Sequence, residues 1–97
     1  MENLEFDLTT RVENKPADCG KRVSYNEITF GSDYYVLYNQ ALHRVTVCKM
    51  VSDGNAPAFK IRYSQTEEVY LGEKQPDDEN CYIVNLEKYF PLFYEIR

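Results

Sequence analysis

The sequence contains no tryptophan, one histidine and no long apolar run. A membrane-spanning helix needs roughly 20 consecutive apolar residues, whereas the purely apolar stretches here are only a few residues long. The first residues also lack the basic segment followed by an apolar core that is typical of a secretory signal peptide. We therefore expect a cytoplasmic protein that does not enter a membrane.

Cysteine is also scarce, and its pattern excludes two common uses. The three cysteines, Cys19, Cys48 and Cys81, are odd in number and none belongs to a C-x-x-C motif. An odd count without a secretory signal argues against a disulfide framework. Because His43 is the only histidine, a closed four-ligand zinc site would need a carboxylate as well. We expect no metal and no cofactor.

Motifs that carry catalysis are missing too. The chain has no P-loop and no G-x-G-x-x-G. No nucleophile motif such as G-x-S-x-G accompanies His43. Cys19 lies beside Lys21 and Arg22, but no activating or resolving partner is near it in the sequence. We therefore expect a protein that is not an enzyme and has no catalytic residues.

The charges that are present are unevenly distributed. The net charge of the 97-residue chain is −5, and residues 1–41, 42–62 and 63–97 contribute −3, +3 and −5. A chain of this length is expected to form one domain, 1–97, around one core. A basic centre between acidic flanks indicates internal charge balance first and a polarised binding surface second.

Apolar residues alternate with polar ones along most of the chain, which is the period of a half-buried β-strand. The first part, 1–20, is expected to be a strand at 4–8 followed by a loop. Strands are expected in the meander 21–71, at 23–30, 34–38, 42–51, 59–63 and 67–71. The next segment, 72–80, is predicted to be an acidic loop. The last part, 81–97, is predicted to contain strands at 81–84 and 92–96 around a helical turn, 85–90.

This pattern predicts an all-β fold with one short helical turn, a small antiparallel meander that closes into an SH3-like barrel. Closure would protect the strand edges. An exposed strand edge would allow a second copy of the chain to pair with it and form a homodimer. Asn85 is expected to cap the helical turn and Pro91 to end it.

Residues 31–71 resemble the Tudor-type, SH3-like small barrel. The pieces that match are Gly31, the strand ending at Tyr38, the strand around 44–47, the strand ending at Tyr63, and the acidic strand 67–70. Members of that family that read methylated lysine or arginine hold the cation in an aromatic cage. The resemblance implies cage positions at Tyr38 and Tyr63, whereas the two other positions, at 42–43 and 64–66, are not aromatic here.

Tyrosine is abundant, with nine residues, and it is enriched at binding hot spots. Tyr34 and Tyr35 are adjacent in a predicted strand, so their side chains should point to opposite faces. The densest acidic segments are 67–68 and 77–79. The residues predicted to contact a partner are Tyr34, Tyr35, Tyr38, Tyr63, Tyr70, Glu67, Glu68, Asp77, Asp78 and Glu79.

These observations favour a small acidic protein that binds a larger protein and inhibits or modulates it, in the manner of toxin-immunity or phage counter-defence proteins. The expected partner is a nucleic-acid-binding or defence protein. The first alternative is a Tudor-like module that reads a peptide or a methylated side chain. The second is a small barrel that binds single-stranded nucleic acid through the basic segment 42–62, although the net negative charge opposes that use.

Overall fold

The computed structural model describes residues 16–76 and 80–97. The strand predicted at 4–8 and the acidic residues Asp77, Asp78 and Glu79 lie outside the described residues. The described strands are β1 (Cys19–Val23), β2 (Asp33–Tyr38), β3 (Ala41–Asp53), β4 (Ala56–Tyr63), β5 (Glu73–Lys74), β6 (Cys81–Asn85) and β7 (Leu92–Ile96). Two short helices accompany them, the 3-10 helix η1 (Tyr25–Glu27) and α2 (Leu86–Tyr89).

All strand pairs are antiparallel, and the sheet has the order β1-β7-β2-β3-β4-β6-β5. The predicted antiparallel, β-rich fold is therefore confirmed. Within the described residues no ladder joins β1 to β5, so closure into a barrel is not observed there. Neither short helix in this part of the chain has the length or apolar character needed to cross a membrane.

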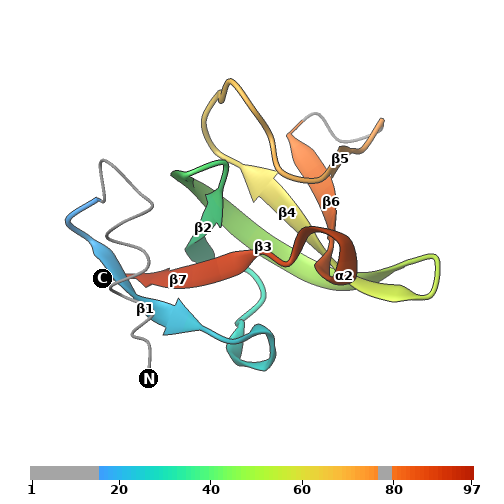
Figure 1. Ribbon diagram of the computed structural model, residues 1–97, viewed down its shortest axis with the longest axis horizontal. Coiled ribbons are helices and arrows are strands. Elements are labelled where there is room, and N and C mark those ends of the chain that lie inside the picture. The colour runs from blue at the N-terminus through green and yellow to red at the C-terminus, as the bar shows by residue number, and fades with distance from the viewer. Residues whose placement is uncertain (1–15, 77–79) are drawn as a thin grey trace.

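The sheet is strongly curved, and β3 runs through its middle (Figure 1). Phe93 on β7 and Phe59 on β4 are in edge-to-face contact, with ring centroids 5.6 Å apart. Three strand spacings in a flat sheet would put β7 and β4 about 14 Å apart. The ring contact therefore shows that the sheet curls until distant parts of its inner face pack against each other.

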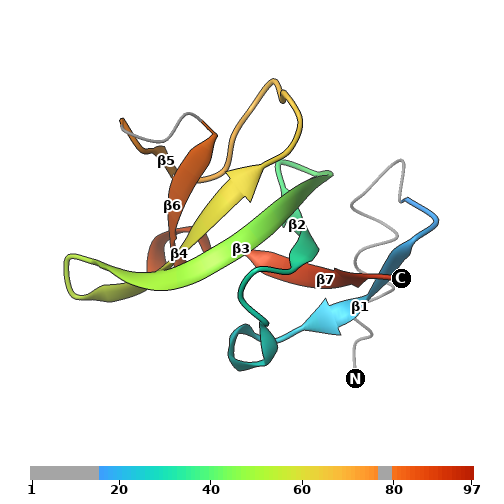
Figure 2. The same cartoon turned by 180° about the vertical axis from the view of Figure 1, so that it is seen from behind.

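The long β3–β4 hairpin projects beyond the rest of the sheet (Figure 2). Its two-residue connection contains Gly54, at φ 64°. A positive φ at the first central position is typical of a type II′ turn, in which glycine is preferred there. The sequence prediction of two long strands joined at this Asp-Gly site is confirmed.

The predicted strand at 23–30 is wrong. The chain forms β1 at Cys19–Val23, which begins in the predicted N-terminal loop and ends at the first residue of the predicted strand, and then turns through η1. Ser24 accounts for this turn, because it forms a capping box in which its backbone N–H donates to the Glu27 carboxylate at 3.1 Å. Tyr25 then lies over the core, and its hydroxyl donates to the carbonyl of Pro91 at 2.6 Å.

The helical turn at the C-terminal end agrees with the prediction. The side-chain oxygen of Asn85 accepts hydrogen bonds from the backbone N–H groups of Glu87 and Lys88, at 2.9 and 3.0 Å. Phe90 ends α2 in a left-handed conformation, with φ 48°, immediately before Pro91. Asn85 also donates to the carboxylate of Asp53 at 3.0 Å, which ties α2 to the end of the β3–β4 hairpin.

Candidate functional site

The predicted contact tyrosines are divided between the two faces of the sheet. Tyr34 and Tyr63 belong to the inner core, whereas Tyr35 packs with Cys19 and Tyr94 on the outer face. The opposite orientation expected for Tyr34 and Tyr35 is therefore confirmed. Tyr34, Tyr35 and Tyr63 are each less than a tenth exposed. In this conformation their rings offer little contact area to a partner.

Several tyrosine hydroxyls hold backbone segments in place. The hydroxyl of Tyr34 accepts a hydrogen bond from the backbone N–H of Thr29 at 2.9 Å, and the hydroxyl of Tyr35 donates to the Asp18 carboxylate at 2.7 Å. The hydroxyl of Tyr63 accepts from the backbone N–H of Leu71 at 2.9 Å. Burial raises the pKa of Tyr63 to about 12. Much of the tyrosine content thus serves the fold itself.

The strand predicted at 67–71 is wrong, because residues 64–72 form a loop between β4 and β5. Tyr70 anchors this loop: its ring stacks on Tyr82 with centroids 4.9 Å apart, and its hydroxyl accepts from the backbone N–H of Glu67 at 2.8 Å. Leu71 is 1% exposed. The loop backbone is therefore held by phenolic hydroxyls rather than by a sheet ladder, and Tyr70 fixes the position of Glu67.

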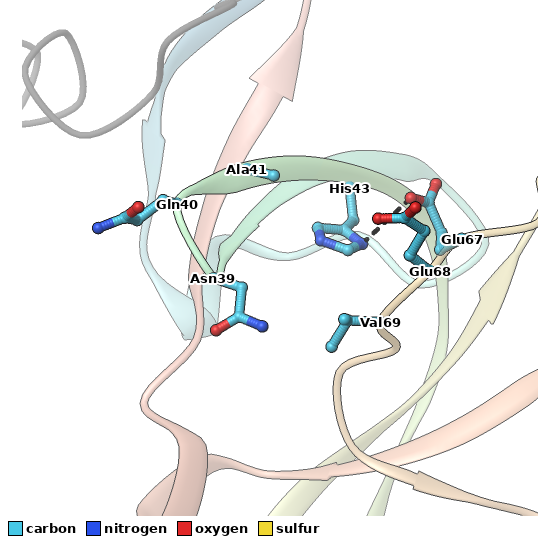
Figure 3. Close-up of a pocket in the computed structure, with 7 residues that line it drawn as sticks. All are labelled: Asn39, Gln40, Ala41, His43, Glu67, Glu68 and Val69. Atoms are coloured by element: carbon cyan, nitrogen blue, oxygen red, sulfur yellow. Dashed lines mark ion pairs between the residues drawn. The ribbon is translucent and has the colours of Figure 1, made fainter.

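The loop and the β2–β3 turn enclose a hollow of about 500 Å³. It is lined by Asn39, Gln40 and Ala41 from the hairpin, by His43 from β3, and by residues 67–69 from the loop. Figure 3 shows the imidazole of His43 and the carboxylates of Glu67 and Glu68 turned toward one another, with Asn39 and Val69 below them. Glu67 and Glu68 are the two acids of the predicted contact set that the structure describes, and both line this hollow.

His43 forms the buried floor of this hollow. The residue is 4% exposed, and its Nδ1 atom has no hydrogen-bond partner within the described part of the chain. The nearest carboxylate oxygen, Oε1 of Glu67, is 3.7 Å away, which is too long for a hydrogen bond. The imidazole lies between the rings of Tyr38 and Tyr63, at centroid distances of 6.1 and 5.8 Å.

The position of His43 bears on the resemblance to the Tudor-type barrel. Tyr38 and Tyr63, the two residues that match cage positions, do lie on the same side of the sheet and both contact one side chain. That side chain is the imidazole of His43, and Tyr63 is only 2% exposed. A methylated cation could reach both rings only if His43 moved.

The turn between β2 and β3 has an uncommon backbone. Asn39 and Gln40, its two central residues, have φ values of 55° and 62°. Positive φ at both positions is typical of a type I′ turn, which twists in the sense that a hairpin needs. Asparagine tolerates this region, but glutamine does so only at a cost. This strained turn forms one wall of the hollow.

Phe90 was not among the residues predicted from the sequence. Its side chain is 69% exposed, the largest exposure among the large hydrophobic side chains of residues 16–76 and 80–97. With Tyr38, Asn39, Gln40 and two leucines it lines a second hollow of about 320 Å³, which shares the β2–β3 turn with the first. A bulky residue at the end of a capped helical turn, just before proline, is the sequence signal that could have identified it.

We name this combined surface the turn face, defined as Asn39, Gln40, Glu67, Glu68, Val69 and Phe90. Val69 is 44% exposed, so each hollow has an exposed apolar side chain at its border. The turn face brings two carboxylates, two amides and two apolar groups to one end of the sheet. These groups can bind a ligand, but they include no nucleophile with an activating base.

The basic residues of the central segment lie elsewhere. Register places Arg44 opposite Tyr35 and Arg62 opposite Thr46, so both guanidinium groups are on the outer face of the sheet. Arg44 forms an ion pair with Asp33 at 3.4 Å. The carboxylates of the turn face and these two guanidinium groups therefore lie on different surfaces, and the pairing of Arg44 with Asp33 is the internal charge balance that the sequence indicates first.

Metal chemistry and known relatives provide no further assignment. None of the three cysteines is in a disulfide. Among residues 16–76 and 80–97, no three histidine, cysteine, aspartate or glutamate side chains are placed to hold a metal ion. In comparisons with known proteins, no family model, curated protein or solved structure matches the chain.

Proposed function

We propose that this protein binds a larger protein through the turn face and inhibits or modulates it without catalysis. The observation that supports this proposal best is the exposed side chain of Phe90. Its backbone is left-handed and is followed by the buried Pro91, so the ring is held away from the core. Fixed aromatic side chains of this kind are enriched in protein interfaces.

The charge of the turn face indicates the kind of partner. Glu67 and Glu68 are adjacent to the apolar groups, and the whole chain has a net charge of −5. Complementary charge accelerates association and selects among partners. We infer a partner with a basic site, such as a cytoplasmic nucleic-acid-binding or defence protein whose site this protein would cover.

The two alternatives draw less support from the described residues. A reader of methylated side chains would use Tyr38 and Tyr63, but the ring of Tyr63 is buried against His43. A nucleic-acid binder would use the outer basic residues, of which Arg44 already pairs with Asp33. Both alternatives remain possible outcomes of the experiment below.

The proposal is tested by affinity capture with the wild type and a set of variants as baits, followed by identification of the retained proteins. The baits are the wild type, Phe90→Ser, the double variant Glu67→Lys/Glu68→Lys, and Met50→Ser as a matched control. Met50 is 49% exposed, lies on the projecting β3–β4 hairpin and lines neither hollow of the turn face. The lysate comes from the organism that encodes the protein.

We expect the wild type and Met50→Ser to retain one protein in stoichiometric amount. Phe90→Ser and the double charge reversal should each weaken its binding about tenfold or more, because truncating an interface anchor or reversing a paired charge removes 1.4 kcal/mol or more. A fifth bait, with Asp77, Asp78 and Glu79 changed to lysine, tests the other acidic segment. Capture of only nucleic acid that salt releases, or of a protein whose binding no turn-face change affects, contradicts the proposal.

A further inference from the structure

The floor of the larger hollow contains a buried polar atom, Nδ1 of His43, that has no hydrogen-bond partner among the described residues. When an imidazole carries its proton on Nε2, its Nδ1 atom is an acceptor, and an ionised carboxylate can only accept. Nδ1 of His43 and Oε1 of Glu67 are 3.7 Å apart and cannot satisfy one another in those states. A buried acceptor that finds no donor destabilises the protein. With the proton on Nε2, the pair presents two acceptors to the hollow and can receive a donor from outside.

The described part of the chain does not supply that donor. No donor among the described residues reaches Nδ1 of His43, and Arg44, the next residue in β3, pairs with Asp33 at 3.4 Å. The side chain of Glu67 is 27% exposed while that of His43 is 5% exposed, so Glu67 can be reached from solvent and His43 lies deeper in the hollow.

The side chains that line the hollow favour a positively charged organic group as the hydrogen-bond donor. Glu68 adds a second carboxylate beside Glu67, and Asn39 adds an amide. A resident metal ion is disfavoured, because among the described residues no group of three potential ligands is placed to bind one. The volume of about 500 Å³ lies within the range of about 300–1,000 Å³ that holds small ligands.

We propose that the hollow receives one basic side chain of the protein partner, an arginine or a lysine, whose N–H groups donate to Nδ1 of His43 and to the carboxylate of Glu67. Glu68 stabilises the positive charge, and Val69 packs against the aliphatic part of the side chain. Arginine is expected to bind more tightly, because its guanidinium is weakly hydrated and has several donors in one plane. This inference rests on the proposed function and specifies how the partner is recognised.

The experiment uses the full chain and three probes: capped arginine, capped lysine, and capped citrulline, which has the shape of arginine without its charge. Because the chain has one histidine, the ring nitrogens of His43 give an unambiguous NMR signal. Backbone amides of residues 39–41 and 67–69 provide a second readout. The variants are Glu67→Gln and His43→Phe, with Glu87→Gln on α2 as the matched control.

Capped arginine should shift the Nδ1 signal of His43 and the amides at the hollow, whereas citrulline should leave them unchanged. Glu67→Gln should weaken binding about tenfold, as expected for losing a hydrogen bond to a charged group, and Glu87→Gln should not. His43→Phe preserves the ring packing but should also lose binding. If that variant does not fold, Glu67→Gln alone decides the result.

Three outcomes overturn the inference. They are no shift at the highest soluble concentration of capped arginine or lysine, equal shifts with citrulline, and a proton on Nδ1 of His43 in the arginine-bound state. These results are independent of the capture experiment. A partner retained through Phe90 while the probes fail would leave the proposed function intact and exclude the basic side chain as the recognised group.

Discussion

Tyr63 links three parts of the molecule through one side chain. Its ring contacts His43 and Tyr70 edge-on, and its hydroxyl accepts the backbone N–H of Leu71. The residue is 2% exposed. The same burial that removes it from the contact surface makes it the residue that positions both the floor and the loop of the hollow.

The pKa of Tyr63 predicts a loss of stability in alkali. Burial raises this pKa from 10.0 to about 12. The contribution of the protonated Tyr63 to stability is complete below pH 10 and disappears as the pH rises toward 12, because the unfolded chain loses the phenolic proton first. A shift of two units corresponds to about 2–3 kcal/mol of unfolding free energy.

Tyr63→Phe should therefore flatten the pH dependence of stability between pH 10 and 12. At neutral pH it should cost about 1–2 kcal/mol, because the N–H of Leu71 loses its acceptor. Urea unfolding followed by circular dichroism at a series of pH values measures both effects. Burial also raises the pKa of Tyr25 and Tyr82, so the comparison is the difference between the two proteins. Parallel curves for wild type and variant would contradict the prediction.

At the scale of elements, the β2–β3 turn contains a residue in a strained backbone conformation that the sequence does not explain. Gln40 has φ 62° although glycine would adopt this conformation without strain. Gln40 also lines both hollows of the turn face. A strained residue at the border of a candidate site is consistent with a role in binding.

Gln40→Gly should stabilise the protein by about 0.5–1 kcal/mol, because relief of the left-handed strain exceeds the added entropy of the unfolded chain. Asn-Gly is also the preferred pair for a type I′ turn. The measurement is the urea midpoint at neutral pH. The control is Gln65→Gly in the exposed loop, which should not stabilise. A destabilised Gln40→Gly would show that the glutamine side chain makes contacts that outweigh the strain.

Elements held by local signals could be predicted from the sequence, and elements held by distant contacts could not. Alternation and the Asp-Gly turn predict β3 and β4, and Asn85 predicts α2. Residues 67–71 have strand-like composition, yet the hydroxyls of Tyr63 and Tyr70 hold them as a loop. Those phenolic contacts depend on the tertiary fold, which no local pattern encodes.

The residues of the candidate site also divide into those that could be predicted from the sequence and those that could not. Glu67 and Glu68 were predicted from their charge, and the structure places both at the hollow. His43 and Phe90 were not predicted. The role of His43 depends on which side chains surround it, whereas Phe90 has a local signal, a bulky residue between a capped turn and Pro91, that was not used in the prediction. His43 acquires its buried, unpaired nitrogen only when the loop lies over β3, and Phe90 is exposed only because α2 ends there.

At the scale of the whole molecule, the inner core joins strands that lie three places apart in an open sheet. Phe93 of β7 and Phe59 of β4 are each 0% exposed and in contact, although β2 and β3 separate their strands in the sheet order. The pairing of β1 with β7 joins residues at opposite ends of the described chain. The β3–β4 register, with Tyr63 opposite Val45, brings the loop 64–72 to the same end of the sheet as the β2–β3 turn, and both contribute to the turn face.

The shared core predicts that both ends of the sheet unfold together. Cys19 on β1 and Cys81 on β6 are each 1% exposed, so each thiol reports the opening of its own end. In a Cys48→Ser background, a thiol reagent should label both cysteines at the same slow rate. Labelling of this kind follows the population of the open state when reclosing is fast.

Phe93→Leu should then raise both labelling rates by about tenfold, because the loss of buried ring volume costs roughly 1–2 kcal/mol. Met50→Leu, at an exposed position of the projecting hairpin, should change neither rate. Mass spectrometry of peptides labelled over time separates the two sites. If Cys19 reacted much faster than Cys81 and was insensitive to Phe93→Leu, β1 and β7 would open on their own. The curled core would then not couple the two ends of the sheet.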